Sequence, residues 1–287
     1  IMKVGIQLYS VKEHLMKDGI GTMKAVAEAG YKYIEPFCSE RFPIGEAEKG
    51  YGLGLTRQEA KAFLADTGIT IVGGHYYTGD FEAMCDYYAY LGAENFGTGG
   101  YFYPGGKDEL LRKIEEMNKN AEIAKKYGMR FYYHNHFWEY QKFDGKTVME
   151  IIAEESDPGL MYFEQDNYWA ARGGVDPVEE AEKLGDRLIL MHQKDFAKDA
   201  GEPINLYEER VDINQPTTSE IHQKNRHVGT FAEVGNGILP IQDYIDVGNK
   251  LGVKYILLEQ DLTAIDEIES IKISMSAFKK FNGIQWE

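Results

Sequence analysis

Eight short apolar runs alternate with eight longer amphipathic segments along this chain of 287 residues. The short runs have the length of buried strands, and the longer segments carry apolar side chains at the helical period. Strands that alternate with helices pair in parallel, because each helix returns the chain to the same edge of the sheet. Eight such units, without a linker or a break in composition, predict an α/β fold, a single-domain (β/α)8 TIM barrel over residues 1–287.

The expected elements follow this alternation along the whole chain. Strands are predicted at 2–9, 31–35, 70–75, 93–99, 129–136, 160–166, 188–192 and 255–259. Helices are predicted at 11–29, 56–65, 80–91, 107–127, 145–154, 177–183, 239–251 and 264–281. We expect long loops at the Gly-rich stretch 38–55 and at the polar stretch 196–237. The alternative is an open doubly wound sheet, but residues 8–11 lack the Gly-rich phosphate turn that follows its first strand.

The charge of the chain narrows the classes of ligand. Acidic residues outnumber basic ones by 47 to 31, and a surface with a net charge of −16 repels the phosphate backbone of nucleic acids. Cys38 and Cys85 form no metal-binding spacing, so a metal site has to use His, Asp and Glu. No apolar stretch approaches the roughly 20 residues that cross a bilayer, and the first residues lack the pattern of a secretory signal. We therefore expect a cytoplasmic protein that binds neither nucleic acid nor membrane.

Ionisable side chains stand at the ends of five predicted strands, where the chemistry of a barrel is located. The fifth strand ends in the run FYYHNHFWEY, and His134 and His136 share one of its faces because side chains alternate with period two. The other strand ends carry His75, Glu164 with Asp166, His192 with Lys194, and Glu259. Carboxylates that converge without a cation repel each other, so the pattern favours a divalent metal with imidazole and carboxylate ligands.

Several of these residues have a second interpretation. His134 lies one pleat further inward than His136 and is also suited to a hydrogen bond inside the barrel. His75 fits a substrate contact or a structural partner equally well. Glu164 is suited to a salt bridge with Lys194 or to a role in the site itself.

Aromatic and basic residues near the strand ends indicate contacts with a substrate. Trp138 and Trp169 closely follow the ligand candidates and are suited to walling a sugar site, although both also fit the core. The stretch 196–237 contains a basic cluster around Arg226 and His227 that is suited to a phosphate or another acidic group. Loops of this length are usually functional, but a solvated loop or a subunit contact explains the cluster as well.

Five motifs carry a resemblance to a known family. They are YHNHFWEY, FEQDNYWAARGGVDP, LMHQKDF with EPINL, FAEVGNGI and LLEQD. Together they make the chain similar to the sugar phosphate isomerase/epimerase family of xylose isomerase-like barrels, from the first strand to the eighth. The patterns D-x-Y-W…G-x-D-P and H-x-K-D are the most specific to this group.

The resemblance implies a set of metal ligands and a base. In similar epimerases, the ends of strands five to eight hold one divalent ion through Glu, Asp, His and Glu, which correspond here to Glu139, Asp166, His192 and Glu259. Some relatives place the glutamate where this chain has His134, so the ligand from the fifth strand is either Glu139 or His134. In relatives with the pattern H-N-H-x-x-E, the second histidine resembles a base beside the metal, and this residue is His136 here.

The family that the chain resembles includes isomerases, epimerases and lyases, and proton abstraction next to a carbonyl is common to them. We predict a divalent-metal-dependent isomerase or epimerase of a sugar or sugar phosphate, with His136 or Glu259 as base and Lys194 as electrophilic helper. Manganese is the favoured metal, with magnesium, cobalt or zinc as alternatives. The alternative function is a lyase on the same scaffold, like inosose dehydratase or a C-glycoside deglycosidase catalytic subunit.

Two further classes are less compatible with the sequence. An endonuclease IV-like nuclease needs several zinc ions and a basic groove, which the net charge of −16 argues against. A module that only binds a ligand has no need for the full set of strand-end ligands. A homo-oligomer is compatible with the sequence, since barrels of this kind often pair.

Overall fold

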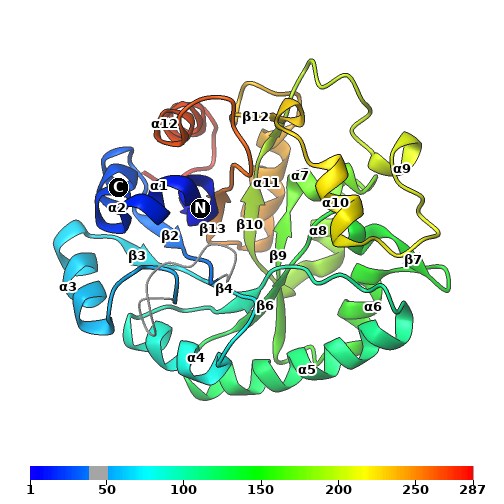
Figure 1. Cartoon of the computed structure of the whole chain (residues 1–287), viewed down its shortest axis with the longest axis horizontal. Helices are drawn as coiled ribbons and strands as arrows, with labels where there is room; N and C mark the ends of the chain where they lie inside the picture. The colour runs from blue at the N-terminus through cyan, green and yellow to red at the C-terminus, as the bar shows by residue number, and fades with distance from the viewer. Residues whose placement is uncertain (39–50, 287) are drawn as a thin grey trace.

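A closed parallel sheet forms the centre of the molecule. The computed structural model describes residues 1–38 and 51–286, so residues 39–50 of the expected loop at 38–55 lie outside the described part. The sheet has the strand order β3-β2-β1-β13-β10-β9-β6-β5-β4, and its strands pair in parallel. The bounds are β1 (Lys3–Gln7), β2 (Tyr33–Glu35), β3 (Thr70–Ile71), β4 (His75–Tyr76), β5 (Gly97–Thr98), β6 (Phe131–His134), β9 (Met161–Asp166), β10 (Leu188–Gln193) and β13 (Tyr255–Leu258). Figure 1 shows the strands in the middle of the molecule with helices around them.

The two edges of this sheet meet in the third predicted strand. The edges are β3 and β4, which are consecutive pieces of one segment. On one side of the segment, Val72 N donates to Ile34 O at 3.0 Å and His75 N donates to Pro36 O at 2.9 Å. On the other side, β4 pairs with β5. The segment therefore closes the sheet and confirms the predicted TIM barrel in place of the open sheet.

Helices follow the strands and cover the outside of the barrel. Their bounds are α1 (Lys12–Lys17), α2 (Gly19–Glu28), α3 (Arg57–Thr67), α4 (Phe81–Tyr90), α5 (Lys107–Lys126), α6 (Val148–Glu155), α7 (Asn167–Arg172), α8 (Pro177–Leu184), α9 (Leu206–Glu209), α10 (Ser219–Asn225), α11 (Ile241–Leu251) and α12 (Glu267–Phe278). Within the described ranges, none of them combines the length and the apolar composition that crossing a bilayer requires.

The helix predicted at 11–29 is two helices in the structure. Asp18 has an extended backbone, and its side chain accepts a hydrogen bond from Gly21 N, so it ends α1 and caps α2. The start of α3 follows the sequence signal, because Thr56 and Glu59 form a complete capping box. Helix α7 was not predicted, and its N-cap is Asp166, whose side chain accepts from Trp169 N.

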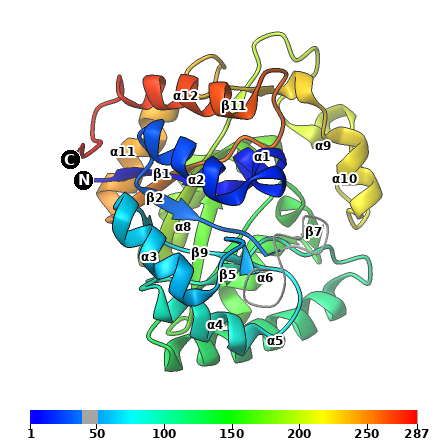
Figure 2. The same cartoon turned by 60° about the vertical axis from the view of Figure 1, so that its left-hand side comes forward.

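The stretch 196–237, expected to lack regular structure, contains α9, α10 and the short strand β12 (Phe231–Ala232). β12 pairs with β11 (Asp195–Phe196), and Figure 2 shows α9 and α10 together on one side of the barrel. A second apolar cluster supports this stretch with Phe137, Trp138, Tyr168, Trp169, Phe196, Leu206, Val211 and Phe231. The stretch is therefore an ordered part of the molecule that lies against the strand ends.

Glycines on neighbouring strands make room for a tyrosine in the barrel interior. A Cβ at Gly97 would lie 2.2 Å from Tyr132 O, and a Cβ at Gly73 would lie 2.6 Å from the Tyr132 hydroxyl oxygen. This hydroxyl donates to the buried Glu35 carboxylate and accepts from Gly74 N at 2.9 Å. Tyr132 therefore separates the apolar barrel interior from the polar strand ends above it.

Candidate active site

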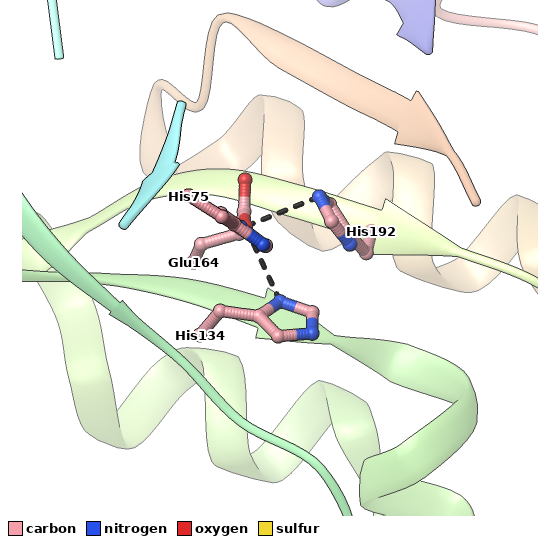
Figure 3. Close-up of side chains that lie close together, drawn as sticks. All are labelled: His75, His134, Glu164 and His192. Atoms are coloured by element: carbon pink, nitrogen blue, oxygen red, sulfur yellow. Dashed lines mark hydrogen bonds and ion pairs between the residues drawn. The ribbon is translucent and has the colours of Figure 1, made fainter. Parts of the chain in front are cut away.

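Three residues at the strand ends form what we call the inner cluster: Glu35, His75 and Glu164. Each is at most 2% exposed. His75 Nε2 lies 2.7 Å from Glu164 Oε1 and 3.3 Å from Glu35 Oε1. His192 Nε2 completes the ring of contacts, at 2.6 Å from Glu35 Oε1 and 3.1 Å from Glu164 Oε1. Figure 3 shows the histidine rings gathered around the Glu164 carboxylate.

Closer to the mouth of the barrel lie the three residues of the outer cluster: Asp166, Lys194 and Glu259. The Lys194 ammonium donates to Asp166 Oδ2 and to Glu259 Oε2. It also lies 3.3 Å from Asp261 Oδ1. A salt bridge between Glu164 and Lys194 was one of two roles considered for Glu164, and the contacts of Lys194 are with Asp166, Glu259 and Asp261 instead. The reason is depth, because Glu164 is in register with Leu190 and Asp166 is in register with His192, so Lys194 lies nearer the mouth than Glu164.

Two histidines lie between the inner and outer clusters. His192 Nδ1 is 3.1 Å from Glu259 Oε2, while its Nε2 faces the inner cluster. His134 Nδ1 is 3.2 Å from Glu164 Oε1, and its Nε2 is 3.8 Å from Asp166 Oδ2. Each ring therefore presents one nitrogen to each cluster.

The charges of the inner cluster are set by burial and by the pairing of imidazoles with carboxylates. Burial alone raises the pKa of Glu164, but contacts with His192, His134 and His75 outweigh it and hold the pKa well below its ordinary value. Burial and the neighbouring Glu164 carboxylate together raise the pKa of Glu35. Burial lowers the pKa of His192, but Glu164, Glu259 and Glu35 raise it well above the ordinary range.

The two outer carboxylates and the two histidines between the clusters form the donor set of a divalent metal site. Ligand atoms of His134, Asp166, His192 and Glu259 all lie within 4.8 Å of one another. Burial raises the pKa of Asp166 to about 6 despite the neighbouring Lys194. Burial also raises the pKa of Glu259, but Lys194 and His192 lower it well below the ordinary value. Two carboxylates and two imidazoles suit Mn, Co, Zn or Mg, and the ammonium of Lys194 shows that the carboxylates already attract a cation.

Glu139, predicted as the metal ligand from the fifth strand, is buried beside this set of ligands and is not part of it. Its Oε1 accepts from the Tyr133 hydroxyl at 2.6 Å, and its Oε2 accepts from His136 N at 2.8 Å. Burial raises its pKa to about 8, although these hydrogen bonds lower it. His134 stands in the group of possible ligands instead. Glu139 therefore remains a predicted ligand, and His134 is the alternative that lies closer to the other three.

A cavity of about 250 Å³ opens directly onto the outer cluster, and Glu259 and His136 form part of its lining. The His136 ring is stacked on Trp138, with ring centroids 4.3 Å apart and an angle of 7° between the planes. Burial, with smaller contributions from His134 and His222, holds the pKa of His136 well below its ordinary value, so the ring is neutral. Its Nδ1 has no hydrogen-bond partner among the described residues.

One face of α10 covers this cavity, and the sequence analysis did not find it. Ser219, His222, Gln223 and Arg226 line the cavity. Their spacing of i, i+3, i+4 and i+7 is that of one helical face, and Thr218 caps the helix by accepting from Ile221 N. The helical spacing and the capping residue were available in the sequence, but a helix of seven residues gives a short pattern.

Of the predicted substrate contacts, Trp138 and Arg226 line the cavity. Three others are buried and do not line the cavity, because their positions are deeper in the barrel: His75, His134 and Glu164. Trp169 is 1% exposed and packs in the second apolar cluster, where its backbone N binds Asp166 Oδ1 at 2.8 Å. The predicted base His136 and the predicted ligand Glu259 face the cavity together, and Lys194 lies just below them.

A (β/α)8 barrel with buried carboxylate and imidazole groups at its strand ends is the class that this structure defines. A family model described as xylose isomerase-like TIM barrel matches residues 23–280, and the chain belongs to this family. An inosose dehydratase of Geobacillus kaustophilus is 27% identical over 140 residues, covering 48% of this chain and 40% of that protein. An inosose dehydratase of Clostridium perfringens is 25% identical over 172 residues, covering 58% of this chain and 53% of that protein. The matched region thus spans about half the length of these relatives or less.

Solved structures resemble this chain over nearly its whole length. A sugar phosphate isomerase/epimerase from Parabacteroides distasonis has a TM-score of 0.75 at 21% identity, covering 99% of this chain and 96% of the other. A probable 3-DHS dehydratase from Bacillus anthracis has a TM-score of 0.65 at 15% identity, covering 98% of this chain and all of the other. At these identities the likeness shows a shared fold.

Proposed function

We propose that the protein is a divalent-metal-dependent isomerase or epimerase that abstracts a proton next to the carbonyl of a sugar. The observation that carries the proposal is the position of the outer cluster. Glu259 lines a cavity of about 250 Å³, and Asp166 and His192 offer further carboxylate and imidazole ligand atoms within 4.8 Å of it. A cavity of this kind over convergent titratable groups is the usual form of an active site.

The donor set fits one divalent ion, with Asp166, His192 and Glu259 as ligands and His134 or Glu139 as the fourth. Manganese is the favoured metal, and magnesium, cobalt and zinc are alternatives with the same ligand preferences. When bound, the ion supplies Lewis-acid polarisation of a substrate carbonyl. The buried positions of Asp166 and His192 keep water away from the ligands on the side of the barrel interior.

His136 is the proposed base. Its ring is neutral, stacked on Trp138 and part of the cavity lining, so the imidazole can take a proton from a substrate there. Glu259, which also lines the cavity, is the alternative base. Lys194 places a positive charge next to Glu259 and Asp166, where it stabilises negative charge that develops on substrate oxygens.

The charges around the cavity favour an uncharged carbohydrate over a sugar phosphate. Arg226 is the only Lys or Arg among the described residues that line the cavity, and it already contacts Asp261 Oδ2 at 3.4 Å and the Tyr9 hydroxyl at 2.9 Å. The lining also contains the carboxylates of Glu259 and Asp261. A phosphate has to compete with Asp261 for Arg226, whereas the rings of Tyr9 and Trp138 suit the apolar face of a sugar.

Hydrogen exchange in deuterated water tests the proposed function. The protein is incubated with Mn²⁺ and a panel of ketoses, keto-inositols and ketose phosphates, and proton NMR follows the hydrogen next to the carbonyl. We expect exchange together with inversion or isomerisation on an unphosphorylated substrate, and its loss after chelation. Exchange that continues undiminished in His136→Gln and in Glu259→Gln contradicts the assigned bases.

A lyase is the second candidate, and one specific observation favours it. The relatives identified by sequence are inosose dehydratases, although each matches over 58% of this chain or less. A dehydratase begins with the same proton abstraction and then loses a β-hydroxyl as water. The NMR experiment separates the two reactions, because a lyase gives a new unsaturated carbonyl product instead of an epimer. The cytoplasmic location and the homo-oligomer expected from the sequence stay predictions.

A further inference from the structure

The orientation of the two histidines between the clusters determines which of their nitrogen atoms a cation in the outer cluster contacts. His134 directs Nδ1 inward to within 3.2 Å of Glu164 Oε1, a close contact without the angle of a hydrogen bond, and Nε2 outward to Asp166. His192 has the opposite orientation, with Nε2 inward to Glu35 at 2.6 Å and Nδ1 outward to Glu259 at 3.1 Å. The two rings therefore face the inner carboxylates through different nitrogens, Nδ1 in His134 and Nε2 in His192.

A neutral imidazole carries one N–H and one lone pair, so only one of its nitrogens can ligate a cation. The inner carboxylates are acceptors when ionised, and a lone pair that faces one of them at 2.6–3.2 Å is repelled. The inward nitrogen of each ring therefore carries the hydrogen. The lone pair is left on the outward nitrogen, in His134 directly and in His192 once a bound cation displaces its second proton, and a cation in the outer cluster can use it there.

We propose that Glu35 and Glu164 are positioning residues, which fix the tautomers and ring orientations of His134 and His192. The atoms assigned to the outer cluster are Nε2 of His134 and Nδ1 of His192. The metal-binding consequence rests on the proposed function, but the tautomers follow from the inner cluster alone. Carboxylates that accept from metal-ligating histidines raise ligand basicity and hold the ring in place.

The surroundings of the inner carboxylates support a positioning role. Glu35 is held by the Tyr132 hydroxyl at Oε2 and by Gln7 Nε2 at Oε1, the latter at 2.8 Å. Glu164 Oε1 contacts the rings of His75, His134 and His192. Both carboxyl groups are fully buried, and neither belongs to the described lining of the cavity. They act on a bound substrate only through the histidines.

The competing interpretation is that the inner cluster itself holds a cation. Ligand atoms of His75, His134, Glu164 and His192 lie within 4.8 Å of one another, so the distances alone allow it. That arrangement needs the lone pairs of His134 Nδ1 and His192 Nε2 to point inward, which is the opposite pair of tautomers. The two interpretations thus predict different protonated nitrogens.

Long-range proton–nitrogen NMR of histidine-labelled protein reads these tautomers directly. We expect Nδ1–H at His134 in the metal-free and zinc-loaded protein, and Nε2–H at His192 in the zinc-loaded protein. In Glu164→Gln, the amide offers an N–H to the His134 ring, and we expect the His134 tautomer to change. Glu35→Gln is the second variant, and we expect it to broaden or shift the His192 signals.

Zinc affinity, measured by chelator competition, is the second readout. We expect Glu164→Gln and Glu35→Gln to bind one zinc about 10–100-fold more weakly than the wild type. Glu202→Gln is the control, because the Glu202 side chain is 3% exposed and pairs with Arg172 at 2.6 Å, outside both clusters. It should change zinc affinity by less than about threefold.

Three results overturn the inference. The first is unchanged tautomers and affinity in both inner variants, and the second is an Nε2–H tautomer of His134 in the wild type. The third is zinc binding that is retained in Asp166→Asn but lost in Glu164→Gln, because this result places the ion in the inner cluster. If the wild type binds no zinc, the proposed function fails, but the His134 tautomer in wild type and Glu164→Gln still decides the positioning role.

Discussion

The inner and outer clusters both draw a carboxylate from β9, and they differ in depth along the barrel. β9 carries Glu164 in the inner cluster and Asp166 in the outer cluster, two residues further on. On β10, His192 likewise precedes Lys194 by two residues, and the spacing on the fifth strand is the same for His134 and His136. Side chains two residues apart share a face of the strand, so each pair differs in depth alone.

Depth decides what each carboxylate contacts. Glu164 faces imidazoles and is sealed from the cavity, while Asp166 contacts an ammonium next to a cavity that admits a substrate. A group sealed among fixed partners orients its neighbours, whereas a group whose cation can be exchanged takes part in chemistry. We therefore propose that the inner cluster supports the site and that the outer cluster takes part in the reaction.

The largest expected effect is the loss of an outer carboxylate. Glu259→Gln and Asp166→Asn should each lower kcat/KM by about 10³-fold or more, because a charge at the reacting centre is removed. Metal analysis of the purified variants should show less than one ion per chain. The outer cluster loses its assigned role if both variants keep the metal and the activity.

Lys194→Met should destabilise the metal-free protein strongly. The ammonium neutralises Asp166 and Glu259, and removing one partner of a buried ion pair costs about 3–5 kcal/mol of unfolding free energy. Added Mn²⁺ should restore most of this loss, because it neutralises the same carboxylates. Equal losses measured by urea unfolding with and without Mn²⁺ would show that Lys194 and the metal do not share these partners.

The pH dependence of metal affinity distinguishes the two candidates for the fourth ligand. Asp166 has a pKa raised to about 6, so below this pH protons compete with the metal and the apparent Kd rises about tenfold per pH unit. Glu139 has a pKa raised to about 8. If Glu139 is the ligand, affinity continues to increase up to about pH 8. His192, whose pKa is raised well above its ordinary value, adds a rise of its own above pH 6 with either ligand. With His134 as the ligand, Glu139→Gln leaves the profile unchanged, whereas with Glu139 as the ligand it removes the part of the rise that ends at about pH 8.

Tyr132→Phe should have the smallest effect, and only on stability. The hydroxyl bonded to Glu35 is lost, which leaves a buried carboxylate oxygen without its donor and costs about 1–3 kcal/mol. Urea unfolding measures the loss, and metal analysis should still find one ion per chain. A variant that folds with full stability but binds no metal would show that Tyr132 contributes to metal binding, which contradicts a purely supporting role for the inner cluster.

The sequence predicted the fold and most strand-end residues, because apolar runs that end in ionisable groups are unusual in a buried sheet. It did not predict how deep in the barrel each of these side chains lies. The predicted pairing of Glu164 with Lys194 followed from their adjacent strands, but the barrel places the two residues in different layers. Glu35 was missed, although it stands at the end of an apolar run directly before Pro36. Its role depends on contacts with residues more than 100 positions away, such as His192.

The stretch 196–237 was harder to interpret from the sequence. Its helices are short, so their periodicity extends over fewer than two turns, and tertiary packing on Trp138 and Trp169 stabilises them. The cavity face of α10 therefore became visible only in the folded chain. The basic residue Arg226 was identified from the sequence, but its pairing with Asp261 follows from the fold.

Anomalous diffraction from crystals soaked in Mn²⁺ tests the division of the two clusters most directly. The account predicts one strong peak bounded by Asp166, His192 and Glu259, on the side of the histidines that faces the cavity. A peak bounded by Glu35, His75 and Glu164 would contradict it, because the inner cluster would then be the metal site and not its support.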